Sequence, residues 1–166
     1  IFVQKQKTMA QKDEEFIRYV INLAADNVLK HGNGPFAAIV VKDGKIIGEG
    51  NNSVTNNFDP TAHAEVVAIR NACEHLKFHQ LDDCVLYTSC EPCPMCFGAI
   101  YWARPERVVY AATKKDAAEV GFDDAFIYEE LKVGQSERRI EFTEINIPEK
   151  LLPFVKWAEK PDKILY

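Results

Sequence analysis

Short β-rich runs and helix-periodic segments alternate along most of this 166-residue chain. Residues 13–32 carry apolar side chains at helical spacing, with Asp13 as the expected cap and Gly32 as the stop. Residues 35–52 hold two β-rich runs around Asp43-Gly44, a sequence typical of a hairpin turn. The pattern then predicts helices over 61–76 and 92–103 and strands over 84–89 and 107–112.

The carboxyl-terminal part continues this pattern less regularly. Residues 116–132 read as a helical segment interrupted at Gly121, and residues 148–160 as a helix containing Pro153. Apolar residues alternate over 139–147, which predicts an edge strand. Strands that alternate with helices favour a sheet covered on both faces. We therefore expect an α/β fold, a three-layer α/β/α sandwich around a central mixed sheet of about five strands.

Length and termini indicate one compact unit. A chain of this size can bury one core, so we expect a single domain over residues 13–166 after an N-terminal extension, residues 1–12. The eight residues before Met9 lack the apolar stretch and small-residue cleavage site of a signal peptide. Met9 is a candidate native start, with those eight residues an added segment or a leader.

Charge and composition restrict the class of partner. The formal net charge is -5, and acidic residues outnumber basic ones in the last third, so the chain is not built to follow a phosphate backbone. No apolar run of about 18 residues exists, so no membrane span is expected. Five cysteines without an export signal suit a reducing, cytoplasmic compartment, where clustered thiols are metal ligands or catalysts more often than disulfides.

The stretch SCEPCPMC holds three of those cysteines, Cys90, Cys93 and Cys96. A Cys-x-x-Cys pair alone is compatible with a redox site, a structural zinc or a catalytic metal. A structural zinc needs four closing ligands, and the other cluster with suitable chemistry is His63 with Glu65. Together the two clusters match H-x-E…P-C-x-x-C, the signature of zinc-dependent deaminases.

Physical chemistry supports a catalytic site. Three ligands, His63, Cys93 and Cys96, leave a fourth zinc position for water, whose pKa the metal lowers toward about 7. Cys93 and Cys96 share one face at a helix start, where the positive helix end stabilises thiolates. Glu65 lies two residues from His63 and is free to move protons. We expect one zinc ion per subunit, with water or hydroxide as the fourth ligand.

The remaining cysteines are assigned packing roles. Cys90 has the same spacing from Cys93 as Cys96 has, which makes it a competing ligand. We place Cys90 at the end of a strand as a buried thiol that does not bind the metal. Cys73 and Cys84 are expected to pack as small hydrophobic residues.

Residues 59–70 and 86–105 resemble the cytidine-deaminase-like superfamily, and within it the small bacterial guanine deaminases. The stretches GPFAAIVVKDG and GFDDAFIY fit the same group, and the similarity runs from about Glu14 to the carboxyl terminus. The resemblance implies zinc-dependent hydrolysis of guanine to xanthine and ammonia. It also implies that Glu65 takes a proton from water and delivers it to the purine ring and the leaving amine.

The resemblance further implies the substrate contacts. Asn52 and Asp124 contact the purine, and Asp124 also helps to move protons; an amide offers a base edge both a donor and an acceptor. Aromatic walls stack on a flat base. The remaining implied contacts are Phe36, Ala64, Trp102 and Tyr166.

Other interpretations of these contacts stay open. Asn51 is the alternative to Asn52 if the register differs by one, and Asp123 reads as structural. Asp124 can equally stabilise a helix amino terminus. Phe36 is also compatible with ordinary strand core, and Trp102 with a dimer interface.

The resemblance implies a homodimer, with the carboxyl-terminal segment swapped so that Tyr166 closes the neighbour's pocket. The expected partner is a small purine, with neither nucleic acid nor membrane. Guanosine deaminase and tRNA adenosine deaminase are the enzyme alternatives, the latter requiring a basic surface, and cytidine deaminase fits less well. A zinc-stabilised binding module would not need Glu65, and a thioredoxin-like pair explains neither His63 nor Glu65.

Overall fold

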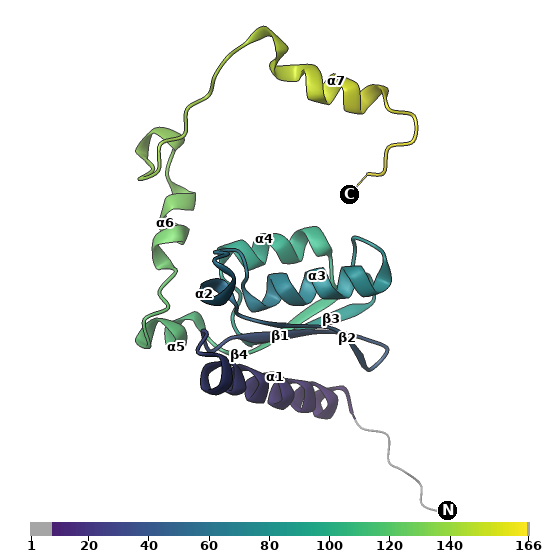
Figure 1. The fold of residues 1–166 in the computed structure, drawn as a ribbon, viewed down its shortest axis with the longest axis vertical. Helices are drawn as coiled ribbons and strands as arrows, with labels where there is room; N and C mark the ends of the chain where they lie inside the picture. Colours follow the sequence, from purple (N-terminus) through teal and green to yellow (C-terminus); the bar gives the residue numbers. More distant parts are fainter. Residues whose placement is uncertain (1–7, 166) are drawn as a thin grey trace, which may run out of the picture. The chain divides into compact units, whose positions relative to one another are not determined.

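A computed structural model describes residues 8–165 and divides the chain into two units, before and after the junction of Asp124 and Ala125 (Figure 1). The first unit holds a four-stranded sheet and five helices in its described part. Its helices are α1 (Met9–His31), α2 (Val54–Asn57), α3 (Ala64–Leu76), α4 (Pro94–Ala103) and α5 (Lys114–Glu119). Its strands are β1 (Ala37–Lys42), β2 (Lys45–Asn51), β3 (Cys84–Cys90) and β4 (Arg107–Ala112). Over residues 8–165, no helix combines the length and apolar character needed to cross a membrane.

The sheet is mixed, with strand order β2-β1-β3-β4. Strand β1 runs antiparallel to both β2 and β3, whereas β3 and β4 are parallel. The hairpin between β1 and β2 turns at Asp43 and Gly44, whose φ angles are 50° and 76°. Two successive positive φ values match the hairpin turn that Asp-Gly favours. The predicted hairpin is confirmed, and the mixed sheet has four strands where about five were expected.

Helices cover both faces of this sheet: α3 and α4 lie on one face, and α1 crosses the other (Figure 1). Side chains of β1 alternate between two cores in the same way. Ala38 and Val40 join the core beneath α3 and α4, while Ala37, Ile39 and Val41 join the core with α1. Alternation follows from the two-residue period of a strand. The predicted three-layer α/β/α fold is therefore confirmed.

Two glycines of β2 let α3 lie directly on the sheet. A Cβ atom added to Gly50 would stand 2.3 Å from the carbonyl oxygen of Ala64, and one on Gly48 would stand 2.5 Å from that of Ala68. Both positions are closer than real Cβ contacts allow, so no side chain fits there. The close approach fixes the first turn of α3 against β2, and with it the residues that open that helix.

Helix α1 begins five residues before the predicted start. Thr8 is the N-cap and forms a capping box with Gln11, so Asp13 was wrongly predicted as the cap. Asp13 instead accepts hydrogen bonds from the Tyr87 hydroxyl at 2.6 Å and from both terminal nitrogens of Arg107 at 2.8 and 2.9 Å. Asp13 thus ties α1 to β3 and β4. Gly32 ends the helix with φ 67°, as predicted.

Replacing this carboxylate should destabilise the first unit in a pH-dependent way. The Arg107 hydrogen bonds hold the pKa of Asp13 below its usual value. A lowered folded-state pKa adds stability above the unfolded pKa of about 3.9 and loses it as the pH falls through the folded value. Asp13→Ala should therefore cost about 1.5–3 kcal/mol at pH 7 in denaturant titrations, and markedly less near pH 3. The matched change Glu14→Ala, in an exposed pair with Arg18, should cost under about 1 kcal/mol at either pH; equal losses for the two variants would refute the role of Asp13.

The second unit, from Ala125, contains α6 (Ala125–Lys132), two short 3-10 helices (Gln135–Glu137 and Pro148–Leu151) and α7 (Leu152–Glu159). The break predicted at Gly121 is present, with φ 95° there. Pro153 stands in the first turn of α7, where its missing N–H costs no hydrogen bond.

The strand predicted over 139–147 is wrong: within residues 125–165 no strand forms. Its alternating pattern is real, but a strand also needs a neighbouring strand to pair its backbone, and the described second unit supplies none. Ile140 and Ile145 remain 75% and 69% exposed in the single chain.

Candidate metal centre and active site

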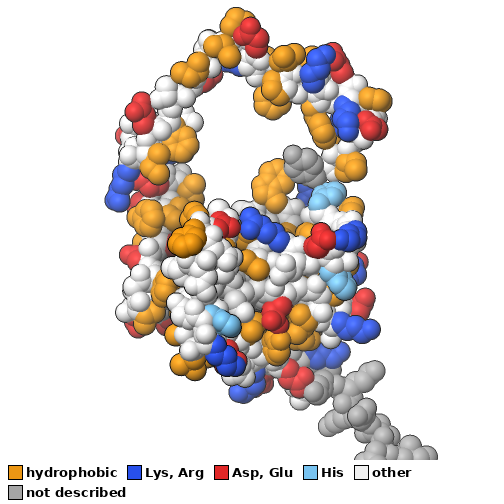
Figure 2. All heavy atoms as spheres, in the orientation of Figure 1, with side chains coloured by type: hydrophobic (Ala, Val, Ile, Leu, Met, Phe, Trp, Pro, Cys, Tyr) orange, Lys and Arg blue, Asp and Glu red, His pale blue; other side chains and the backbone are white. Residues whose placement is uncertain are grey.

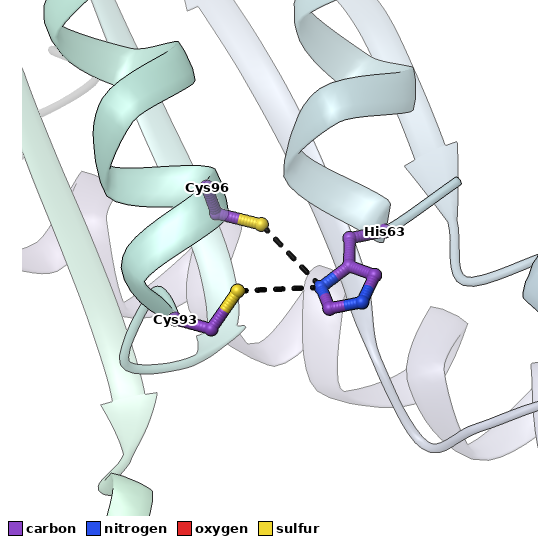
Figure 3. Close-up of side chains that lie close together, drawn as sticks. All are labelled: His63, Cys93 and Cys96. Atoms are coloured by element: carbon purple, nitrogen blue, oxygen red, sulfur yellow. Dashed lines mark hydrogen bonds between the residues drawn. The ribbon is translucent and has the colours of Figure 1, made fainter. Parts of the chain in front are cut away.

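Two helix amino termini meet at the candidate metal centre. His63 is the N-cap residue of α3, Cys93 is the N-cap of α4, and Cys96 lies in the first turn of α4. The His63 Nδ1 atom is 3.4 Å from the Cys93 Sγ atom and 3.6 Å from the Cys96 Sγ atom (Figure 3). The three side chains point toward one another across the gap between the helices. The structure thus brings together all three predicted ligands.

These distances suit tetrahedral zinc. Bonds of about 2.3 Å to sulfur and about 2.0–2.1 Å to nitrogen place the two donor atoms roughly 3.5 Å apart at a tetrahedral angle. All three ligand atoms lie within 4.8 Å of one another, and no further His, Cys, Asp or Glu of the described chain joins the group. Three protein ligands with one open position are typical of a catalytic zinc rather than a structural one.

Hydrogen bonds couple the three candidate ligands to one another and shift their pKa values. A hydrogen bond from the Cys96 thiol, and a further one with His63, lower the pKa of Cys93 to about 4. The same bond to Cys93, together with burial, raises the pKa of Cys96. The hydrogen bond with Cys93 also raises the pKa of His63. Cys93 is thus a ready thiolate, stabilised further by the positive end of α4.

Glu65 lies beside the three ligands without belonging to their group. It stands in the first turn of α3 and is 6% exposed. Its Oε2 atom is 3.4 Å from the Cys96 Sγ atom, and its Oε1 atom is 3.2 Å from the Thr88 hydroxyl. Burial raises the pKa of Glu65, so its carboxyl holds a proton more strongly than an exposed one. A carboxyl group with this property suits proton transfer near neutral pH.

Cys90 takes no part in the three-residue group. Its thiol is buried at the end of β3 and donates to the carbonyl oxygen of Thr113 at 3.5 Å. Burial raises the pKa of Cys90 to about 11. Cys84 is fully buried in the core beneath α3 and α4, and Cys73 packs against that core.

Asn51 and Asn52, the two candidate purine contacts, lie at the end of β2: Asn51 is its last residue, and Asn52 directly follows it. The Asn51 side-chain oxygen is buried without a hydrogen-bond partner. The Asn52 amide lies against Gly34, where an added Cβ would stand 3.3 Å from it.

Asn27 of α1 holds the backbone around Asn52. Its side-chain nitrogen donates to the carbonyl oxygens of Gly34 at 2.8 Å and of Asn52 at 2.9 Å, and Asn27 is 2% exposed. The Asn52 N–H in turn donates to the Phe36 carbonyl at 3.0 Å. One buried amide thus joins the segment carrying Phe36 to the segment carrying Asn52.

Phe36 has an aromatic partner that the sequence did not predict. The Phe36 and Phe122 rings meet edge to face, with centroids 4.9 Å apart and planes at 87°. Phe122 belongs to the stretch GFDDAFIY, in which the sequence pointed only to Asp124. An aromatic residue two positions before the candidate acid was the available signal. Phe122 is therefore a candidate wall residue beside Phe36.

The other predicted contacts lie in different environments. Burial, followed by the negative charge of Cys93, raises the pKa of Asp124, which ends the first unit near the ligands. Ala64 is fully buried in the core beneath α3, so its side chain packs against the sheet. Trp102, on α4, is 65% exposed. Tyr166 lies outside the described residues.

Comparison with known proteins identifies the class. Residues 10–112 match the model of the cytidine and deoxycytidylate deaminase zinc-binding region. The chain therefore belongs to this deaminase family, and its expected zinc cofactor is confirmed, with His63, Cys93 and Cys96 as candidate ligands.

Particular relatives are more informative still. The chain is 56% identical to guanine deaminase of Bacillus subtilis, over 92% of this chain and 98% of that protein. The X-ray structure of that enzyme superposes with a TM-score of 0.90. Guanine deaminase from Nitrosomonas europaea gives a TM-score of 0.63 at 31% identity, covering 75% of this chain and 76% of that one. A tRNA-specific adenosine deaminase of Haemophilus influenzae is 39% identical over 71% of each chain. The resemblance to guanine deaminases is thus confirmed.

Proposed function

We propose that this chain hydrolyses guanine to xanthine and ammonia. One observation carries the hydrolytic part: the donor atoms of His63, Cys93 and Cys96 converge within 4.8 Å, with the buried carboxyl of Glu65 beside them. The choice of guanine is supported by the 56% identity to a guanine deaminase over nearly the full length of both proteins. Water adds to the ring carbon that bears the amine, and the amine leaves as ammonia.

Each residue of the candidate site has a separate role in this reaction. Zinc, when bound by His63, Cys93 and Cys96, lowers the pKa of water to about 7 and so supplies the nucleophile. Glu65 accepts a proton from the attacking water and passes it to a ring nitrogen. It then moves a second proton, from the newly added hydroxyl group, to the amine, which leaves as ammonia. Asn52 offers a donor and an acceptor to the base edge, which orients the ring. Phe36 contributes a stacking surface.

Two related substrates are alternatives within the same chemistry. A tRNA substrate would need a basic surface, yet the chain has 25 acidic against 20 basic residues. On the face drawn in Figure 2, basic and acidic side chains are interspersed, without a broad basic area. Guanosine differs from guanine by a ribose. It can be a substrate only if the site has space for that sugar beside the purine.

A substrate panel tests the proposal directly. Purified, zinc-loaded protein is assayed for ammonia release from guanine, guanosine, adenine, cytidine and a tRNA anticodon stem-loop. Turnover of guanine with little release from the others supports the proposal. Faster release from guanosine or the stem-loop would assign the same chemistry to another substrate. No release from any of them, with zinc bound, would favour a zinc-stabilised binding module.

We also propose that residues 13–166 act as one cytoplasmic deaminase domain in a homodimer, with the carboxyl-terminal segment exchanged. Support comes from the second unit, which presents many apolar side chains that the single chain leaves uncovered. The most exposed of them are Ile140, Ile145, Phe154, Ile164 and Leu165. Apolar surface of this extent normally packs against a partner, and a second copy of the chain supplies one without any additional protein. Light scattering that gives the mass of a single chain would contradict the dimer.

Removing the last two residues should impair catalysis more than folding. If the tail closes a purine pocket, deleting Leu165 and Tyr166 removes an aromatic contact worth about 1–3 kcal/mol. We expect the KM for guanine to rise roughly 10- to 100-fold while the melting temperature stays within a few degrees. Deleting the four residues from Lys163 to Tyr166 should raise KM by about the same factor as deleting the last two. Unchanged kinetics in the two-residue deletion would remove the tail from the site.

A further inference from the structure

Thr88 is a buried polar side chain at a position where the strand pattern calls for an apolar one. It lies on β3 and is 1% exposed. Leu86, two residues earlier on the same face, belongs to the core beneath α3 and α4. A hydroxyl buried in such a core costs free energy unless it is hydrogen-bonded. Its presence therefore indicates a specific partner.

That partner is Glu65. The Thr88 hydroxyl donates to the Oε1 atom of Glu65 at 3.2 Å, and its alternative acceptor, the carbonyl oxygen of Ala37, is at 3.4 Å. A hydroxyl has one hydrogen to donate, and a charged carboxylate is a stronger acceptor than a neutral carbonyl. The hydrogen therefore goes to Glu65 whenever its carboxylate is ionised.

The two oxygens of Glu65 thus face different surroundings. Oε1 is held from the sheet side by Thr88, whereas Oε2 lies 3.4 Å from the Cys96 Sγ atom. Fixing one oxygen restricts rotation of the carboxyl group and keeps the other directed at the metal ligands. Proton transfer depends steeply on such alignment.

We propose that Thr88 is a positioning residue that holds the Glu65 carboxylate in the orientation needed for proton transfer. The inference rests on the proposed role of Glu65 and deepens it. A residue that acts in this way should affect turnover and leave substrate affinity and metal binding intact. A purely structural threonine would instead affect stability, and its loss would not depend on Glu65.

The first variant is Thr88→Val, which keeps the shape and removes the hydroxyl. We expect kcat for guanine to fall about 10- to 100-fold, the loss of one hydrogen bond to a charged group. KM should stay within about two-fold, and zinc content should be unchanged. Thr88→Ser should restore most of the turnover. If the valine variant folds poorly, Thr88→Ser and Thr88→Ala serve as a second pair, because they differ only in the hydroxyl.

Ser89→Ala is the matched control on the same strand. Its hydroxyl points to the opposite face and accepts from the Ala37 N–H at 3.1 Å rather than contacting Glu65. We expect some loss of stability but a kcat close to that of the unaltered protein. A drop in kcat equal to that of Thr88→Val would mean that any hydroxyl lost from this strand end has the same effect, and would overturn the proposal.

A double-mutant cycle separates this inference from the proposed function. In the Glu65→Gln background, Thr88→Val should lower the residual kcat no further, because the hydroxyl acts through the carboxylate. If the single variant Glu65→Gln is slow but the single variant Thr88→Val has normal turnover, only the role of Thr88 is overturned. The same fold loss in both backgrounds would overturn it as well. Normal turnover in Glu65→Gln would instead remove the proton-transfer role on which both depend.

Discussion

Glu65→Gln is expected to bind zinc at one ion per chain and to lose nearly all turnover. Glutamine preserves the size of the side chain and can still accept a hydrogen bond from Thr88, but it cannot accept and return a proton. General acid-base catalysis contributes about 10²–10⁴-fold, and here one group serves several transfers. We therefore expect kcat for guanine to fall roughly 10³-fold or more, measured by ammonia release. Zinc content, measured by atomic emission on the same sample, should not change.

The matched control is Glu74→Gln on the same helix. The Glu74 side chain is 77% exposed and pairs with Lys77 at the surface, far along α3 from the metal ligands. Its replacement should leave kcat, KM and zinc content as they are. A Glu65→Gln variant with a rate near that of this control would show that another group moves the proton, and Asp124 would become the next residue to test.

The sequence was sufficient to predict that the three candidate ligands come together and that the fold is layered. His63, Cys93 and Cys96 stand at or near helix starts that proline, alternation and apolar spacing all mark. The Asp43-Gly44 pair also predicted the hairpin that joins β1 and β2. These features depend on residues that are close together in the chain, so they can be recognised from one sequence.

Features that depend on distant partners were missed. Asp13 resembled a helix cap, but its partners Tyr87 and Arg107 lie on two strands far away in the chain. Phe122 is a candidate wall residue because its ring contacts the ring of Phe36. Local sequence marks such residues as aromatic or charged, but it does not reveal which distant side chain each of them contacts.

The strand expected over 139–147 failed for a related reason. Period-two alternation shows which face of a segment is apolar, but pairing requires an available neighbouring strand. The described second unit offers none, and the alternating isoleucines stay exposed in the single chain.

Cys96→Ser and Cys90→Ser should have opposite outcomes, although both replace a buried sulfur with oxygen within the same short stretch. A serine hydroxyl stays protonated at neutral pH and is a poor zinc ligand, so Cys96→Ser should lose most of its zinc and its activity. Cys90→Ser keeps a donor for the carbonyl oxygen of Thr113 and removes no ligand. It should retain one zinc ion per chain and a kcat within about three-fold of the unaltered protein.

Thermal unfolding with and without a chelator gives a readout that does not depend on turnover. A metal that binds only the folded state adds RT ln(1 + [L]/Kd) to stability, about 4 kcal/mol when the free metal is 1,000 times Kd. The unaltered protein and Cys90→Ser should therefore lose several degrees of melting temperature in chelator, and Cys96→Ser should be insensitive to it. If Cys90→Ser were the insensitive variant instead, Cys90 and Cys93 would be the ligand pair, and His63 would have to reach the end of β3 rather than the first turn of α4. The separations of 3.4 and 3.6 Å from His63 Nδ1 to the two sulfurs argue for Cys96, because they already match the spacing of ligands around one tetrahedral zinc ion.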